Sequence, residues 1–269
     1  MATLGTKLSA AFMLVAFPLA GMAIVVFGRS QAPKQLESSF TLTRSAVTLH
    51  EPVYVRFTLR NTSAEVVQVD LGKNRRSSFQ FSIRTPSGSW VRSLQVDEAG
   101  FGRRGMVKLD PGETYRQDLL VNLWYQFAKP GRYVVEVKVL GALRAASGAT
   151  INFPGSERLP LWVRPRDAKQ LEAVCASLAK TASTATNADK ALGAALALSY
   201  VDDSAAVAYL ARLAARPALR SLAIDGLARV AKAEGLDTVT SRLTARQAEL
   251  VPLIKSKLRE AEAGARAMD

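Results

Sequence analysis

The stretch LDPGETYRQDLLVNLWYQFAKPGRYVVEVKVL, residues 109–140, decides the fold of this chain. It contains two tight turns, Asp110-Pro111-Gly112-Glu113 and Lys129-Pro130-Gly131, which are built from residues that favour turns. After the second turn, residues 133–139 are rich in the β-branched side chains that suit a pleated, half-buried strand. One face of that strand carries Tyr133, Val135, Val137 and Val139. The stretch therefore predicts an inner strand of a β-sandwich.

Outward from this stretch, apolar and polar residues alternate with the period of a strand. In residues 53–60, for example, valine, phenylalanine and leucine alternate with tyrosine, arginine and threonine. Asn61-Thr62-Ser63 then matches a glycosylation acceptor, but these residue types also suit a hairpin turn, which we favour. Further strands are expected near 67–71, 79–83, 90–94, 106–109, 150–153 and 159–163. Seven or more short strands separated by turn signals predict an antiparallel sandwich.

Residues 39–164 resemble an immunoglobulin-like domain of bacterial exported proteins. The resemblance rests on Val53–Asn61, on Leu-Asp-Pro-Gly-Glu at 109–113, and on the Gly-x-Tyr-x-Val run within 130–137. Such a run is typical of the penultimate strand of these modules. Because Cys175 is the only cysteine, the chain lacks the cysteine pair of antibody domains, and no intrachain disulfide can form.

After Pro165-Arg166-Asp167 the composition shifts to alanine and leucine, which indicates helices. Asp167 with Gln170 resembles a capping box that uses aspartate at its first position. Helices are expected from this cap onwards and near 188–200, 203–215, 217–233 and 236–260. Gly235 suits a helix end, and Pro252 is expected to kink or interrupt the last helix.

The helical part contains an internal echo. Ala194, Leu198 and Val201 recur 29 residues later as Ala223, Leu227 and Val230. On these residues the segment 168–260 resembles HEAT-type helical repeats, although the spacing is shorter than the roughly 40 residues usual there. A plain helical bundle is the alternative. Stacked helix pairs present a surface to a partner, so the resemblance implies a small docking face.

Residues 8–27 carry no charge and are long enough for a membrane-spanning helix, but they also fit the apolar part of a signal peptide. We therefore divide the chain into a signal peptide or single transmembrane anchor (1–32), an immunoglobulin-like β-sandwich (33–165) and a HEAT-like helical domain (166–269). Both interpretations of residues 1–32 predict export to the periplasm or to the extracytoplasmic face of the inner membrane. Whether this segment is cleaved stays open.

The chain is strongly basic, with 36 lysines and arginines against 23 acidic residues. The excess lies mainly in residues 31–166, which hold 20 basic and 11 acidic residues. Such a field favours anionic partners, whether lipid headgroups, acidic glycans, nucleic acid or an acidic protein face. A proteome rich in arginine would produce the same excess without a specific partner.

The loops of the sandwich offer one hypothetical binding site. If strands run up and down in sequence, the loops 72–77, 97–105 and 122–131 share one end of the sandwich. Glycine exposes backbone N–H groups, and arginine offers planar forks suited to carboxylate or phosphate. The hypothesis places an anion- or partner-binding surface at Lys73, Arg75, Arg76, Gly102, Arg103 and Arg104, beside Trp124, Tyr125 and Phe127. The alternative is solvated loop charges above a buried aromatic cluster.

No enzymatic chemistry is indicated by the residue inventory. Residues 100–105 fit G-x-G-x-x-G, but a strand-like pattern follows where a nucleotide site needs a helix. His50 is the only histidine and lacks partners for a zinc site or a catalytic triad. Asp202-Asp203 suits the start of a helix better than a catalytic dyad. We therefore expect no enzyme, no cofactor and no metal.

The sequence predicts a non-enzymatic, exported or membrane-tethered module that binds a protein partner and acts as a scaffold. The alternative is a module that binds anionic glycan or lipid headgroups through a basic loop end of the sandwich. No specific nucleic-acid partner is expected, and the membrane would be reached through residues 8–27 if they are not cleaved.

Overall fold

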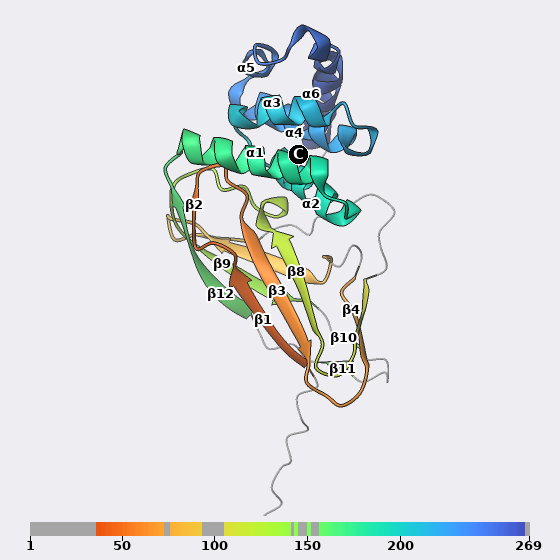
Figure 1. Ribbon diagram of the computed structural model, residues 1–269. Helices are drawn as coiled ribbons and strands as arrows, with labels where there is room; N and C mark the ends of the chain where they lie inside the picture. Colours follow the sequence, from red (N-terminus) through yellow and green to blue (C-terminus); the bar gives the residue numbers. More distant parts are fainter. Residues whose placement is uncertain are drawn as a thin grey trace, which may run out of the picture. The chain divides into compact units, whose positions relative to one another are not determined.

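The computed structural model describes residues 36–72, 76–92, 105–140, 143–144, 150–151 and 156–266. They form a β-sandwich followed by helices, within one compact unit that begins at residue 34 (Figure 1). The predicted order of a β body and an α-helical tail is confirmed. The apolar segment 8–27 lies outside the described residues, and no described helix is long and apolar enough to cross a bilayer.

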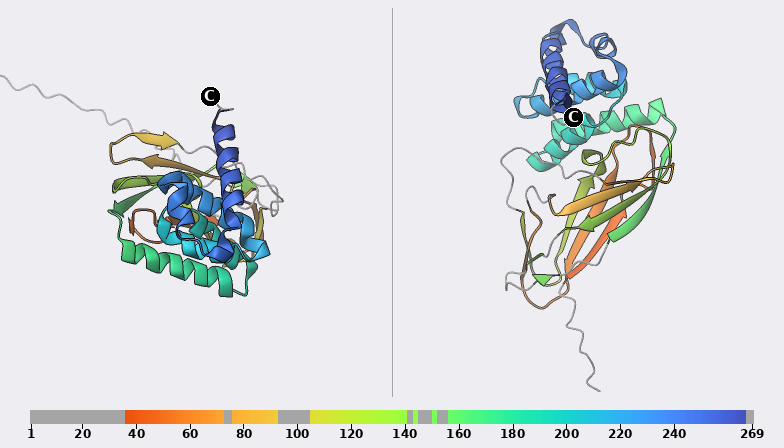
Figure 2. Two further views of the ribbon diagram at one scale, coloured as in Figure 1. Left: turned by 90° about the horizontal axis from the view of Figure 1, so that it is seen from above. Right: turned by 180° about the vertical axis from the view of Figure 1, so that it is seen from behind.

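The sandwich consists of two main sheets, which Figure 2 shows from two further sides. The three-stranded sheet has the order β1-β3-β8, and its strands are Leu36–Leu42, Tyr54–Asn61 and Thr114–Leu120. The five-stranded sheet has the order β2-β12-β9-β5-β6, and its strands are Ala46–Thr48, Ser156–Arg164, Gly131–Val139, Phe79–Arg84 and Trp90–Arg92. Two small ribbons pair β4 with β7 and β10 with β11, namely Val67–Asp70, Met106–Leu109, Leu143–Arg144 and Thr150–Ile151.

The sandwich core lies between the two main sheets because strands such as β3, β5 and β9 bury alternate side chains. In β9, Tyr133, Val135 and Val137 are buried, as the alternation predicts, while the residues between them face outward. Aromatic rings fill the centre, where the Phe57 and Phe79 rings meet edge to face with their centroids 5.0 Å apart. The sandwich is therefore stabilised mainly by burial of apolar surface.

One pairing departs from the predicted antiparallel arrangement, because β2 runs parallel to β12. Trp162 pairs with Ala46 across more than a hundred residues of chain, a register that local alternation cannot reveal. Residues 61–63 turn the chain as predicted but do not form a hairpin, because β3 pairs with β1 and β8 whereas β4 pairs with β7; the turn is held by Asn61. Its buried side chain donates hydrogen bonds to the carbonyl oxygens of Glu65 and Leu109, at 2.7 and 3.0 Å, and accepts one from the N–H of Ser63.

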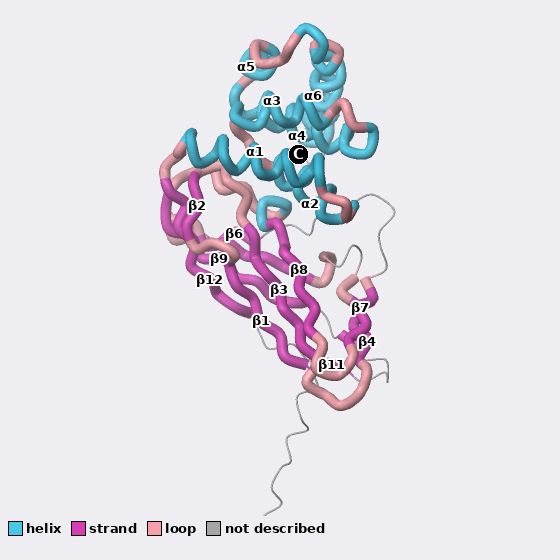
Figure 3. Tube along the Cα trace, in the orientation of Figure 1, coloured by secondary structure: helices cyan, strands magenta, loops and turns pink. Residues whose placement is uncertain are grey.

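The helices follow β12 along the chain (Figure 3). They share a second apolar core. They are α1, α2, α3, α4, α5 and α6, at Ala168–Thr184, Ala188–Ser199, Val207–Leu213, Arg220–Glu234, Leu236–Thr240 and Leu250–Arg266. Short 3-10 turns stand at Val121–Leu123, Ser204–Ala206, Pro217–Leu219 and Ala245–Gln247. The helix expected over 236–260 is thus two helices, and the HEAT-type interpretation of the tail stays a prediction.

Pro252 does not interrupt the last helix, contrary to the prediction. It lies in the first turn of α6, where backbone N–H groups have no partner within the helix and a missing N–H costs nothing. Gly235 ends α4 with a positive φ of 94°, a conformation that favours glycine.

The capping box at the start of α1 is only half formed. The Asp167 side chain accepts a hydrogen bond from the Gln170 N–H at 3.0 Å, as predicted. The Gln170 side chain instead donates to Glu51 of the sandwich at 2.7 Å, and the Asp167 N–H donates to the Thr48 hydroxyl at 2.7 Å. The start of α1 is therefore tied to β2 and to the turn that follows it.

An ion pair between half-exposed Arg166 and the buried carboxylate of Asp203 fixes the helices further. The Arg166 guanidinium donates to both carboxylate oxygens of Asp203, at 2.5 and 3.0 Å, and the Asp203 side chain is 2 % exposed. Asp203 also accepts a hydrogen bond from the N–H of Ala205, so it caps the turn before α3 as the sequence suggested. Asp202, its neighbour, accepts a hydrogen bond from Gln126 of the sandwich. Residues 202–203 are thus structural.

Candidate functional site

Most of the predicted basic loop site falls on residues that the structure does not describe. Lys73, Arg75, Gly102, Arg103 and Arg104 lie outside the described residues, and only Arg76 of the proposed set lies within them. Arg76 is half-buried, and its carbonyl accepts a hydrogen bond from the N–H of Phe79 at 3.0 Å. The anion-binding role of this set therefore stays a prediction.

The residues that anchor two of these loops lie side by side. The Leu71 N–H donates to the Gly105 carbonyl at 3.0 Å, continuing the pairing of β4 with β7. The approach is so close that a Cβ on Gly105 would stand 2.1 Å from the Gly72 carbonyl oxygen. The topology therefore joins the bases of the loops 72–77 and 97–105, as the hypothesis requires.

The third loop, 122–131, lies elsewhere, which corrects the hypothesis. This loop leads into the first residue of β9. Ser78, next to the loop 72–77, accepts a hydrogen bond from the N–H of Leu140, just beyond the last residue of β9, so the two loops lie at opposite ends of this strand. The loop's aromatic rings pack inward, with Trp124 against Phe81 at 4.6 Å between ring centroids. Phe127 is likewise buried, so the aromatic residues of this loop belong to the core.

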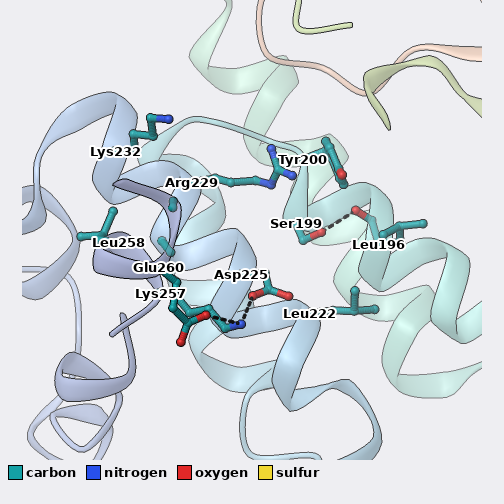
Figure 4. Close-up of a pocket in the computed structure, with 12 residues that line it drawn as sticks. Leu196, Ser199, Tyr200, Leu222, Asp225, Arg229, Lys232, Lys257, Leu258 and Glu260 are labelled. Carbon is teal, nitrogen blue, oxygen red and sulfur yellow. Dashed lines mark hydrogen bonds and ion pairs between the residues drawn. The ribbon is translucent and has the colours of Figure 1, made fainter. Parts of the chain in front are cut away.

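A separate concave site lies in the helical part, in a groove of about 470 Å³ between α2, α4 and α6 (Figure 4). Its apolar lining comes from all three helices, with Leu196 on α2, Leu222 on α4 and Leu258 on α6. Charged side chains stand among them on α4 and α6, namely Asp225, Arg229, Lys232, Lys257 and Glu260. The groove thus combines an apolar lining with a charged rim, as binding grooves generally do.

A close helix contact sets the spacing of the groove. Gly226 of α4 faces α2 so tightly that a Cβ there would stand 2.8 Å from the Ser199 Cα. The same Cβ would stand 3.0 Å from the Leu210 side chain of α3. Glycine at this position lets α2 and α4 approach, which brings Tyr200, at the end of α2, beside the Arg229 side chain of α4.

The rim carries its charges in two groups. At one end the Arg229 guanidinium lies 3.9 Å from the centre of the Tyr200 ring, a cation–π contact. At the other, the Lys257 amine lies 3.5 Å from Asp225 and 3.1 Å from Glu260. The hydrogen bond to Glu260 and the charge of Asp225 raise the pKa of Lys257. Lys257 is therefore held as a cation and already satisfied by this chain.

The groove offers side chains for binding. Among the described residues, no group of histidine, cysteine and carboxylate side chains is arranged to hold a metal ion. His50, at a positive φ of 69°, lies outside the residues that line the groove. Tyr200 and Arg229 occupy equivalent positions of the 29-residue echo. Their contact across two helices could not be read from that spacing.

Solved structures of other proteins show low similarity to this chain. One is AlkC, an alkylpurine DNA glycosylase of Pseudomonas fluorescens, with 14% identity over 49% of this chain and 31% of that chain and a TM-score of 0.24. Another is Spo0M, a sporulation control protein of Bacillus subtilis, with 13% identity over 54% of this chain and 55% of that chain and a TM-score of 0.28. The PapD-like domain 7 of human CEP192 is similar over 56% of this chain and 100% of that chain, at 11% identity and a TM-score of 0.34. The chain thus spans about a third and about half of the first two proteins.

No curated protein matches this chain closely enough to count as a relative. The sandwich, however, matches a family model over most of its length. Residues 43–164 match the model described as flagellar collar protein C, N-terminal domain. This range extends from just after β1 to the last residue of β12. The sandwich of this chain is therefore similar to the N-terminal domain of flagellar collar protein C.

Proposed function

We propose that this chain is a non-enzymatic scaffold module of an extracytoplasmic protein assembly, and that its helical groove holds a segment of a partner protein. The observation that carries the proposal is the groove between α2, α4 and α6, with its apolar lining and charged rim. The match of residues 43–164 to a flagellar collar domain supports a structural role within an assembly. Export rests on the apolar segment 8–27.

The charges of the rim specify the occupant. Lys257 is paired with Asp225 and Glu260, whereas Arg229 stacks on Tyr200 and meets the charge of Asp202, which Lys232 also faces. Lys232 follows Arg229 by three residues, so both cations stand on one side of α4. The occupant is therefore an amphipathic helix with apolar residues toward the leucines and a carboxylate toward Arg229 and Lys232.

The groove also favours a protein partner over the alternative of an anionic glycan or lipid headgroup. Three different helices present apolar side chains to the groove, namely Leu196, Leu222 and Leu258. A phosphate or an anionic sugar has too little apolar surface to cover them. A helical segment would cover these side chains and place its polar face toward solvent. We therefore assign the groove to a protein segment.

The test is co-purification of the tagged full-length chain from its own cells after gentle detergent extraction. The test variant combines Arg229→Glu with Lys232→Glu, which reverses both cations of the rim. The matched control is Leu192→Glu, because Leu192 is exposed on α2 and does not line the groove. We expect a stoichiometric partner with the wild type and the control, and at least about tenfold less with the test variant.

Thermal melting of the three purified proteins shows whether the folds are intact. A partner retained fully by the double variant would contradict the groove assignment. The absence of any stoichiometric protein with the wild type would contradict the scaffold role.

A further inference from the structure

The outer face of the five-stranded sheet exposes two tryptophans. Trp90 of β6 is 45 % exposed and Trp162 of β12 is 50 % exposed. Both rings point away from the core. Trp162 precedes the buried Val163 in β12, and Trp90 pairs with Arg84, which follows the buried Ile83 in β5, so each tryptophan lies on the face opposite to a buried side chain. Tryptophan is one of the side chains that contribute most at protein interfaces, and two half-exposed rings on one sheet are a costly surface to leave uncovered.

The strand register shows what surrounds the two rings. One row across the sheet runs from Pro160 through Val134 and Arg84 to Trp90, and the next from Arg158 through Glu136 and Ser82 to Arg92. Trp162 pairs with Arg132 beside the first row, and Lys138 lies beyond the second. We call this outward surface the tryptophan face, made of Arg84, Trp90, Arg92, Arg132, Val134, Glu136, Lys138, Arg158, Pro160 and Trp162.

The tryptophan face is basic, with five cationic side chains against the single carboxylate of Glu136. The outer face of the three-stranded sheet differs, since its cations Arg56, Arg60 and Arg116 stand with two carboxylates, Glu37 and Asp118. There, Arg56 bonds Asp118 at 2.8 Å. Among the described strands of the two main sheets, the excess of positive charge therefore lies on the outer face of the five-stranded sheet, which general enrichment in arginine would not produce.

Contacts within the tryptophan face hold some of these groups in place. The Arg158 guanidinium lies 5.5 Å from the centre of the Trp90 ring and donates to Glu136 at 3.0 Å. Because Glu136 lies on β9, between β12 and β5, this chain of contacts crosses the sheet. From β12 to β6 the face measures about 14 Å, and along β9 it measures about 20 Å, by the usual strand dimensions. A surface of this size suits the centre of a protein interface.

We propose that the tryptophan face docks an acidic surface of a partner protein that also carries apolar or aromatic side chains. The excess of cations calls for carboxylates on the partner. Val134 and Pro160 lie between the two tryptophans. These apolar side chains favour a partner with apolar groups of its own, which a plain polyanion lacks. This site is independent of the helical groove, because it shares no residue with it.

The test uses defined polymers rather than an unknown partner. The full-length chain, held in a nonionic detergent, is titrated at about physiological ionic strength, where exposed charges are partly screened. The probes are a random glutamate–tyrosine copolymer, polyglutamate of the same length, and heparin, with phosphatidylglycerol bicelles as the lipid probe. We expect the copolymer to bind at least about tenfold more tightly than polyglutamate, because only it can cover the tryptophans.

Two variants separate the roles of charge and of the rings. Arg84→Glu combined with Arg132→Glu should weaken both peptide polymers at least about tenfold. Trp90→Ala combined with Trp162→Ala should reduce the preference for the copolymer over polyglutamate to near one. The matched control is Arg60→Glu with Arg116→Glu, which makes the same charge change on the other sheet and should leave the preference intact.

Three results would overturn the proposal. One is equal affinity for the copolymer, polyglutamate and heparin, which would mean non-specific charge attraction. The second is equal loss in the control and in the Arg84–Arg132 variant. The third is a preference for the bicelles, which would assign the face to a membrane. None of these results concerns the groove, so this proposal and the proposed function can fail separately.

Discussion

Replacing Arg166 by alanine should destabilise the protein by about 2 kcal/mol. The change leaves the buried carboxylate of Asp203 with the N–H of Ala205 and without its guanidinium partner. Breaking a fully buried ion pair costs roughly 3–5 kcal/mol. Because the Arg166 side chain is 43 % exposed, water screens part of the interaction, and we halve that figure.

The assay is urea unfolding of the full-length chain, followed by circular dichroism at neutral pH. The matched control is Arg56→Ala, which breaks the pair with Asp118 on the surface of the sandwich. There the side chains are 47 and 42 % exposed, so we expect a cost below about 1 kcal/mol. If the two variants lose the same stability, the pair between Arg166 and the buried carboxylate does not hold the helices as we infer.

The loss caused by Arg166→Ala should also depend on pH. Burial alone would raise the pKa of Asp203, but hydrogen bonds from Arg166 and from the Ala205 N–H outweigh it and lower that pKa. A carboxylate whose pKa is lowered in the folded protein stabilises it above the unfolded pKa, and this contribution is lost as the pH falls through the folded value. Because both proteins share the unfolded state, the stability difference between them should shrink as the pH falls from the folded pKa of Asp203 in the variant, where burial acts without Arg166, to its lower folded pKa in the wild type. A difference that grows on acidification would refute this account.

Three further predictions concern buried positions. Gly226→Ala should destabilise the helical part by about 1–3 kcal/mol, because the added Cβ would stand 2.8 Å from the Ser199 Cα. Gly193→Ala, in α2, faces open space and should stabilise it by up to about 1 kcal/mol, and urea unfolding compares the two variants. Burial raises the pKa of Cys175 to about 12, so iodoacetamide at pH 8 should label this thiol only after unfolding, and mass spectrometry would show any earlier labelling. Asn61→Ala should cost about 2 kcal/mol in thermal unfolding, because two carbonyl oxygens lose their donor, and an unchanged melting temperature would contradict that role.

Local patterns predicted the strands and most of the helices. The alternation in residues 53–60 and 133–139 predicts β3 and β9 and which of their side chains are buried, because a strand repeats every two residues. The shift to alanine and leucine after Pro165 likewise predicted the helices. The prediction for Pro252 is wrong, because the start of α6 depends on where the preceding turn ends and not on the proline itself.

The surfaces could not be predicted in the same way, because they depend on which strands and helices become neighbours. Alternation alone turns Trp162 outward, but only the order of the sheet shows that Arg158 reaches Trp90 across two intervening strands. Glu51 gave no signal either. It is buried and joins Arg44, Thr48 and Gln170, which lie up to 119 residues away in the sequence.

The position of β12 has a mechanical consequence. This strand lies inside the five-stranded sheet, between β2 and β9, and its end leads within four residues into α1. Tension applied to the helices along the strand axis would load its hydrogen bonds to both neighbours in shear, so that they would have to break together rather than one by one. The joint between the sheet and the helices is therefore held by a central strand with a neighbour on each side and not by an edge strand.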